Sequence, residues 1–197
     1  MDVVCWSDYL CPWCYVGQHR EGLLRDRGLS VTVLPFELHP EIGAQGRRVR
    51  PDGRLRTTFE RIEEECDRLG MAFRRPTRMP NTRRALETAE WTRTHHPDAF
   101  DALHASLFAA QFVTGDPIDD PEVIDRLVSD GGAPATAVRA AVDGGQAGAA
   151  VDEAMARARR AGVSSTPSWL LGHDFVVPGV PDPTTLLRWV DRLMSRD

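Results

Sequence analysis

The sequence predicts an α/β protein in which a strand–helix–strand unit and a strand–strand–helix unit enclose a long all-helical block. Three observations lead to this fold class. β-rich runs lie near the two ends of the chain, helical periodicity fills the middle, and a Cys-x-x-Cys pair lies where the first strand meets the first helix. The chain has 197 residues, which fits one domain that carries a large insertion.

The first unit begins with Asp2–Ser7, a mostly apolar run that is typical of a short strand. Tyr15–Arg27 is predicted to be helical. Pro12 suits the first helical position because it has no N–H to leave unpaired, and Gly28 is a typical C-terminal cap. Val31–Phe36 is a second β-rich run. Because a helix separates the two strands, we expect them to pair in parallel.

The middle of the chain carries repeated helix signals. Asn81 and Asp120 are typical N-caps, while Gly70 and Gly162 are placed to end helices. The apolar residues between these signals recur at helical spacing. The predicted helices are Arg54–Leu69, a helix from Asn81 through Thr94, Asp98–Val113, Glu122–Ser129, Pro134–Val142 and Gln146–Ala161.

Strand character returns close to the C-terminus. Ser168–Leu171 and Phe175–Val177 are predicted to form a hairpin, and Pro183–Met194 is predicted to be the final helix. The predicted organisation is an N-terminal half over 1–40, a helical insertion over about 41–161 and a C-terminal half over 162–197.

Composition narrows the class of protein. Hydrophobic residues make up 42% of the chain and its net charge is −5, so we expect a soluble cytoplasmic protein that binds neither nucleic acid nor membranes. The charge is uneven, because the segment Arg47–Arg84 holds 12 Arg and 6 acids. Two interpretations stay open for this segment: a solvated helical face, or a site for an anionic ligand.

Cysteine is scarce, with only Cys5, Cys11, Cys14 and Cys66. Four cysteines in a chain of this length do not form a disulfide scaffold, and a reducing compartment is indicated. In such a compartment a Cys-x-x-Cys pair is catalytic or binds a metal. A zinc site needs two further ligands, and no second Cys-x-x-Cys or paired histidines supply them, so we expect no metal. Cys66 lies among acids, which should raise its pKa and blunt its reactivity.

The Cys11–Cys14 pair suits thiol–disulfide exchange. A helix N-terminus favours the thiolate of the first cysteine, and a second thiol one turn later can resolve a mixed disulfide. Cys11 is therefore the predicted nucleophile and Cys14 the predicted resolving thiol. Trp13, with Tyr9 and Leu10, is expected to form an apolar rim around Cys11 that suits a peptide or an apolar small molecule.

The segment from Ser7 to Gly17 resembles the active-site segment of the DsbA-like thioredoxin superfamily, and within it the FrnE-type branch. Further stretches resemble that branch in the same order along the chain. They are Pro35–Pro40, Leu107–Phe112 with Asp116–Asp120, and Gly162–Pro167. The resemblance implies a thioredoxin fold interrupted by a helical insertion, which agrees with the pattern of strands and helices.

The resemblance also assigns residues. It implies that Cys11 and Cys14 are the redox pair, and that Thr166–Pro167 is a loop whose proline is cis and faces that pair. The backbone of Thr166 would then pair with an extended substrate segment. The predicted substrate-binding residues are Thr166, Pro167, Trp13, Pro12 and Tyr9.

Two positions depart from the family pattern. Many members carry a buried acid six residues before the first cysteine, and here that place holds Cys5. Proton transfer would then fall to Asp8 or to a water, or be less assisted. Cys5 is either a small buried side chain or a partner for an alternative disulfide with Cys11 or Cys14. Trp13 stands where the best-known oxidases have His, so a strongly oxidising potential is not expected.

The leading functional hypothesis is a thiol–disulfide oxidoreductase that needs no cofactor and uses glutathione, if at all, as redox partner or co-substrate. The alternative is a glutathione-dependent isomerase or transferase acting on a small aromatic or polyketide-like molecule, with the Arg-rich segment holding glutathione carboxylates. Such relatives have Ser where Cys11 stands. A third hypothesis is a chaperone or partner-binding module. Electron-flow direction, substrate and oligomeric state stay open.

Overall fold

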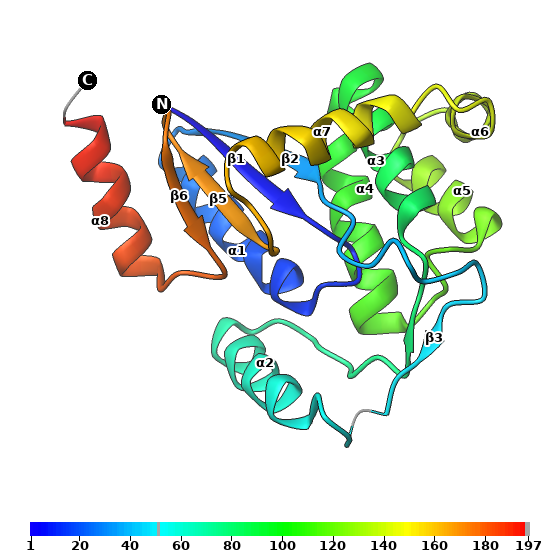
Figure 1. The fold of residues 1–197 in the computed structure, drawn as a ribbon, viewed down its shortest axis with the longest axis horizontal. Coiled ribbons are helices and arrows are strands. Elements are labelled where there is room, and N and C mark those ends of the chain that lie inside the picture. The colour runs from blue at the N-terminus through cyan, green and yellow to red at the C-terminus, as the bar shows by residue number, and fades with distance from the viewer. Residues whose placement is uncertain (51, 196–197) are drawn as a thin grey trace.

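The protein is described by a computed structural model that covers residues 1–50 and 52–195. Its centre is a four-stranded sheet with the strand order β2-β1-β5-β6 (Figure 1). The strands are β1 (Asp2–Ser7), β2 (Ser30–Pro35), β5 (Ser168–Leu171) and β6 (Phe175–Pro178). β1 pairs in parallel with β2 and antiparallel with β5, so the two ends of the chain meet in one sheet. The predicted parallel pair and C-terminal hairpin are confirmed.

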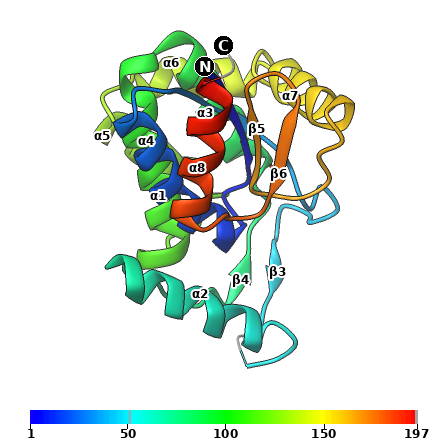
Figure 2. The same ribbon diagram turned by 90° about the vertical axis from the view of Figure 1, so that its left-hand side faces the viewer.

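The alternation of side chains along β1 gives the sheet two apolar faces. Val3 and Cys5 pack with α1 (Pro12–Asp26) and α8 (Pro183–Met194) on one face. Val4 and Trp6, which alternate with Val3 and Cys5 along the strand, pack on the opposite face with α7 (Gly148–Arg160). Figures 1 and 2 show α8 and α7 on opposite sides of the strands. A sheet with helices on both faces agrees with the predicted fold class.

The helices between β2 and β5 form the insertion. They pack mainly around a third apolar cluster, which also includes Cys11 and Cys14. Their bounds are α2 Arg56–Leu69, α3 Arg83–His95, α4 Pro97–Ala109, α5 Pro121–Asp130, α6 Ala135–Asp143 and α7 Gly148–Arg160. The insertion therefore supplies one wall of the region around the cysteine pair.

Two local features differ from the sequence prediction. Asp98–Val113 is not one regular helix, because α4 ends at Ala109 and the chain continues as a π-helix, Ala110–Thr114. Periodicity misses this change because the apolar residues on both sides face the same core. The second feature is a two-stranded ribbon of β3 (Arg47–Arg48) and β4 (Arg78–Met79), too short to leave a strand pattern.

The helix caps agree closely with the expected signals. The side chain of Asp120 accepts a hydrogen bond from the backbone N–H of Glu122, as the predicted N-cap requires. Asn81 lies one residue before the N-cap position, which is Thr82, yet its side-chain oxygen still accepts from the N–H of Arg83. In the described part of the chain, no helix combines the length and apolarity needed to cross a membrane.

Much of the charge of the Arg47–Arg84 segment is engaged in ion pairs with acids inside and outside it. The pairs include Arg56–Glu60, Arg68–Glu65, Arg75–Glu63, Arg78–Asp119, Arg83–Glu87 and Arg84–Asp143. Because these arginines already have acidic partners, the pairing favours the interpretation of a solvated, ion-paired face over a site for an anionic ligand.

Candidate active site

The cysteine pair lies at the start of α1, directly after the carboxyl end of β1. Cys11 is the N-cap residue, Pro12 is the first helical residue, and the N–H of Cys14 donates to the carbonyl of Cys11 at 3.0 Å. Cys11 is 6% exposed and Cys14 is 1% exposed. Both are free thiols in this structure. Both residues are therefore buried, Cys11 slightly less than Cys14.

Thr166 and Pro167 lie opposite Cys11, although 155 residues separate Thr166 from Cys11 in the sequence. The bond between Thr166 and Pro167 is cis. The Cys11 thiol donates to the carbonyl of Thr166 at 3.4 Å, and the N–H of Gly179 donates to the carbonyl of Pro167 at 2.7 Å. The structure thus brings together the two segments that the sequence predicted to form the site.

The two thiols differ in acidity for physical reasons that can be read from their surroundings. A hydrogen bond from the Cys14 thiol is the largest effect on Cys11 and lowers the pKa of Cys11, with a smaller contribution from the Thr166 hydroxyl and with burial acting against both. Burial is the largest effect on Cys14 and raises its pKa, and the neighbouring Cys11 sulfur adds to the rise. A thiolate on Cys11 beside a protonated Cys14 is the arrangement that suits attack by Cys11.

Replacing Thr166 with Val is expected to slow alkylation of Cys11 at neutral pH. The substitution keeps the side-chain shape but removes a buried hydroxyl that lowers the pKa of Cys11. A smaller thiolate fraction should cut the rate roughly two- to fivefold. The check is the rate of iodoacetamide modification, followed by intact mass across a pH series. An unchanged profile in a folded Thr166→Val protein would show that the hydroxyl plays no part.

Asp8 is fully buried beside the pair and is held by backbone donors. Its carboxylate accepts from the N–H of Leu10 at 3.2 Å and from the N–H of Leu38 at 2.7 Å, while its carbonyl accepts from the N–H of Cys11. Burial raises the pKa of Asp8 to about 6. A carboxyl with this pKa can take up and release protons close to neutral pH.

The other two cysteines are buried and unreactive in character. Cys5 is 1% exposed on β1, and burial raises its pKa, so it keeps its proton. The pKa of Cys66 is raised to about 11. The rise was predicted, but its main cause is burial in the insertion, and the neighbouring acids are secondary. Clustered acids are visible in a sequence, whereas the burial of one helix face is not.

The predicted apolar rim needs correction. Tyr9 and Leu10 are buried, at 4% and 7% exposure, so neither is a rim residue. The reason is a partner that sequence spacing does not reveal: the Tyr9 hydroxyl lies 2.9 Å from Nδ1 of His104, in the insertion. Trp13 alone of these three is half-buried, and it borders an open hollow of about 620 Å³ beside α2. That hollow is lined by Trp13, Arg61, Glu64, Glu65 and Arg68.

A mixed sheet with a Cys-x-x-Cys pair at a helix N-terminus, facing a cis-proline loop, defines a thioredoxin-fold protein. Residues 2–190 match the DSBA-like thioredoxin domain, and the chain belongs to this family of thiol oxidoreductases. No curated protein matches the sequence.

Solved structures give the same fold. A probable DsbA oxidoreductase from Streptomyces coelicolor is 21% identical, with a TM-score of 0.86 over 100% of this chain and 91% of that chain. A 2-hydroxychromene-2-carboxylate isomerase is 23% identical, with a TM-score of 0.81 over 100% and 97%. The cytosolic disulfide reductase DsbM from Pseudomonas aeruginosa is 18% identical, with a TM-score of 0.71 over 100% of both chains, and it has also been solved with glutathione.

Proposed function

We propose that this protein is a thiol–disulfide oxidoreductase that works through Cys11 and Cys14. The observation that carries the proposal is the contrast between the two sulfurs. Cys11 is the N-cap residue of α1 and has a lowered pKa, while Cys14, one turn into the helix and more deeply buried, has a raised pKa. This contrast separates the attacking thiolate from the resolving thiol.

In the reducing direction, the Cys11 thiolate attacks one sulfur of a substrate disulfide. The substrate S–S bond breaks, its second sulfur leaves as a thiolate that takes a proton, and a mixed disulfide forms on Cys11. Cys14 then loses its proton and attacks the sulfur of Cys11, which releases the remaining substrate thiol. Two electrons have passed to the substrate and the protein holds a Cys11–Cys14 disulfide. The oxidising direction is the exact reverse.

The surrounding residues have roles in this proposal. The backbone of Thr166, beside Pro167, holds an extended substrate segment against Cys11, and the half-buried Pro12 and Trp13 contact the same segment. Asp8 exchanges the proton of the buried thiol, which the rise of its pKa to about 6 supports. We place the activity in the cytoplasm, on the scarcity of cysteine in the sequence and the likeness to a cytosolic disulfide reductase.

Glutathione is the small-molecule thiol that we propose as redox partner. The glutathione complex of the DsbM reductase supports this choice by analogy of fold. The hollow beside Trp13 adds support, because Arg61 presents a cationic group there that suits a carboxylate of glutathione, whereas Arg68 is paired with Glu65.

Replacing Cys14 with Ser is expected to trap the intermediate. With oxidised glutathione, the variant should gain the mass of one glutathione at Cys11 and keep it, because no second thiol resolves the bond. Intact mass with peptide mapping measures this. The Cys11→Ser variant is the matched control and should gain none. A Cys14→Ser protein that never carries glutathione would contradict the proposed role of Cys11.

A glutathione-dependent isomerase is the second candidate, favoured by the fold likeness to 2-hydroxychromene-2-carboxylate isomerase and by the hollow beside Trp13. In that case glutathione would bind without a covalent bond to the protein, and both cysteines would stay reduced. Equilibrium dialysis with glutathione, combined with thiol counting, separates the two candidates.

A further inference from the structure

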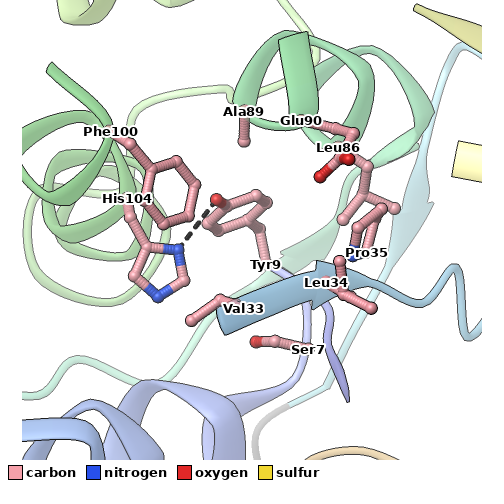
Figure 3. A pocket seen from close by; sticks show the side chains of 10 residues that line it. All are labelled: Ser7, Tyr9, Val33, Leu34, Pro35, Leu86, Ala89, Glu90, Phe100 and His104. Carbon is pink, nitrogen blue, oxygen red and sulfur yellow. Dashed lines mark hydrogen bonds between the residues drawn. The ribbon is translucent and has the colours of Figure 1, made fainter. Parts of the chain in front are cut away.

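A chain of buried polar side chains leads away from the segment that carries the redox pair. Tyr9 lies two residues before Cys11, and its hydroxyl is 2.9 Å from Nδ1 of His104 on α4. Nε2 of the same histidine faces Oε1 of Glu21 on α1 at 3.6 Å. The side chains of His104 and Glu21 are 4% and 2% exposed. Figure 3 shows the Tyr9 hydroxyl directed at His104, with Phe100 beside the imidazole.

This series of buried polar side chains does not form a ligand site. The cavity that Tyr9 and His104 border has a volume of only about 10 Å³, which is at the lower limit for one water molecule. The Tyr9 ring also packs against Phe108, with ring centroids 4.9 Å apart. The Tyr9 hydroxyl and Nδ1 of His104 are therefore each other's partner, and leaving either one without it is costly in such a dry environment.

The chemistry of the three groups fixes how they can interact. Nε2 of His104 forms no hydrogen bond within the described residues, but the Glu21 carboxylate at 3.6 Å only accepts, so its charge favours a hydrogen on Nε2. Nδ1 of a neutral His104 then accepts from the Tyr9 hydroxyl, which keeps its proton because burial, followed by the Glu21 charge, raises the pKa of Tyr9. If His104 is protonated, Nδ1 donates to the Tyr9 oxygen instead. In both states Tyr9 is held by α4 and, through it, by Glu21.

These buried polar side chains connect three parts of the fold: the turn before Cys11, α1 and α4. The relative positions of these parts determine the geometry of the site. Tyr9 belongs to the turn whose Asp8 carbonyl accepts from the N–H of Cys11. Glu21 belongs to the helix that carries Cys14, and its other carboxylate oxygen lies 3.5 Å from Arg25. Arg25 in turn lies 3.3 Å from Asp101 of α4. The insertion helix α4 is thus tied both to the turn before Cys11 and to the helix after it.

We propose that His104 and Glu21 are positioning residues for the redox pair, which act by holding Tyr9 and thereby the turn that presents Cys11 to Cys14 and Thr166. The proposal deepens the proposed oxidoreductase function and rests on it for its purpose. If the contacts among Tyr9, His104 and Glu21 are weakened, we expect the distance between the sulfurs of Cys11 and Cys14 to increase. The hydrogen bond that favours the Cys11 thiolate is then lost.

The test is the pH profile of Cys11 alkylation in the intact protein, with the modified residue located by peptide mapping. In Glu21→Gln and His104→Leu the profile should move to higher pH, and the rate at neutral pH should fall about threefold, which corresponds to a thiolate fraction reduced by the same factor. His104→Gln, whose amide can both accept from Tyr9 and donate to Glu21, should restore most of the rate.

A matched control is Asp119→Asn, which removes a carboxylate of the insertion that lies outside this cavity, is only 10% exposed and is paired with Arg78. It should leave the profile unchanged. Folded Glu21→Gln and His104→Leu proteins with the wild-type profile would overturn the proposal. So would a shift to lower pH in Glu21→Gln, because that direction means that the carboxylate acts by its charge alone. If the wild-type pair never closes a disulfide, the oxidoreductase function fails, while the alkylation profile still reports on His104 and Glu21.

Discussion

Replacing Cys11 with Ser is expected to lower the rate of disulfide reduction by on the order of 10³-fold or more, down to the rate of the thiol reagent alone. Serine keeps the size of the side chain but offers neither a thiolate at neutral pH nor a sulfur that can form a mixed disulfide. The effect is total because the sulfur of Cys11 takes part in every bond exchange. A glutathione-coupled assay of disulfide reduction measures it directly.

The matched control for this variant is Cys66→Ala. Cys66 is also buried, but its pKa is about 11 and it lies on α2, so its removal should leave the rate within about twofold of wild type. A Cys11→Ser protein that still reduces disulfides would show that the pair is not the reaction centre. Loss of activity in Cys66→Ala, with its fold intact, would point to a second redox thiol.

The second large effect concerns stability. Glu65→Ala is expected to lower the free energy of unfolding by about 2–3 kcal/mol, because it leaves the guanidinium of Arg20 buried without its carboxylate. The Arg20 side chain is 2% exposed and lies 2.7 Å from Glu65. The pair joins α1, which carries the cysteines, to α2 of the insertion. Urea unfolding measures the loss, and a thermal midpoint about 5–10 °C lower should accompany it.

Two exposed pairs give the controls for Glu65→Ala. Glu153→Ala breaks a pair with Arg160 whose side chains are both more than half exposed, so the stability should change by under about 0.5 kcal/mol. Arg68→Ala removes the other, exposed partner of Glu65 and leaves Arg20 paired. An equal loss in Arg68→Ala and Glu65→Ala would contradict the assignment of the effect to the buried Arg20.

Sequence signals were sufficient where the local chain determines the structure. The fold class, the parallel β1–β2 pair and the Asp120 cap all follow from local strand, helix and cap signals read in their order along the chain. The partnership of Cys11 with Thr166 did not come from spacing, because the two are 155 residues apart. It came from a likeness to a known family, and the structure brings the two segments together. The precise domain boundaries stay predictions.

The features of the site that could not be predicted from the sequence depend on which polar side chains become buried in the folded protein. Glu21 has the spacing of an ordinary exposed helix residue, yet it packs against His104 because α4 covers that face of α1. Tyr9 looks like a rim residue beside Trp13 and is instead drawn inward by the same histidine. The sequence does place His104 among the apolar residues of its helix, which indicates burial, but without the tertiary arrangement this position does not identify a partner.

The most direct measurement of the central claim is the redox equilibrium of the purified protein across defined ratios of reduced to oxidised glutathione, read by alkylation and intact mass. We predict that Cys11 and Cys14 interconvert between a dithiol and one intramolecular disulfide, with Cys5 and Cys66 reduced throughout. The midpoint then gives the direction of electron flow. A pair that never closes, while glutathione remains bound or attached at Cys11, would contradict the oxidoreductase function and favour the isomerase or transferase.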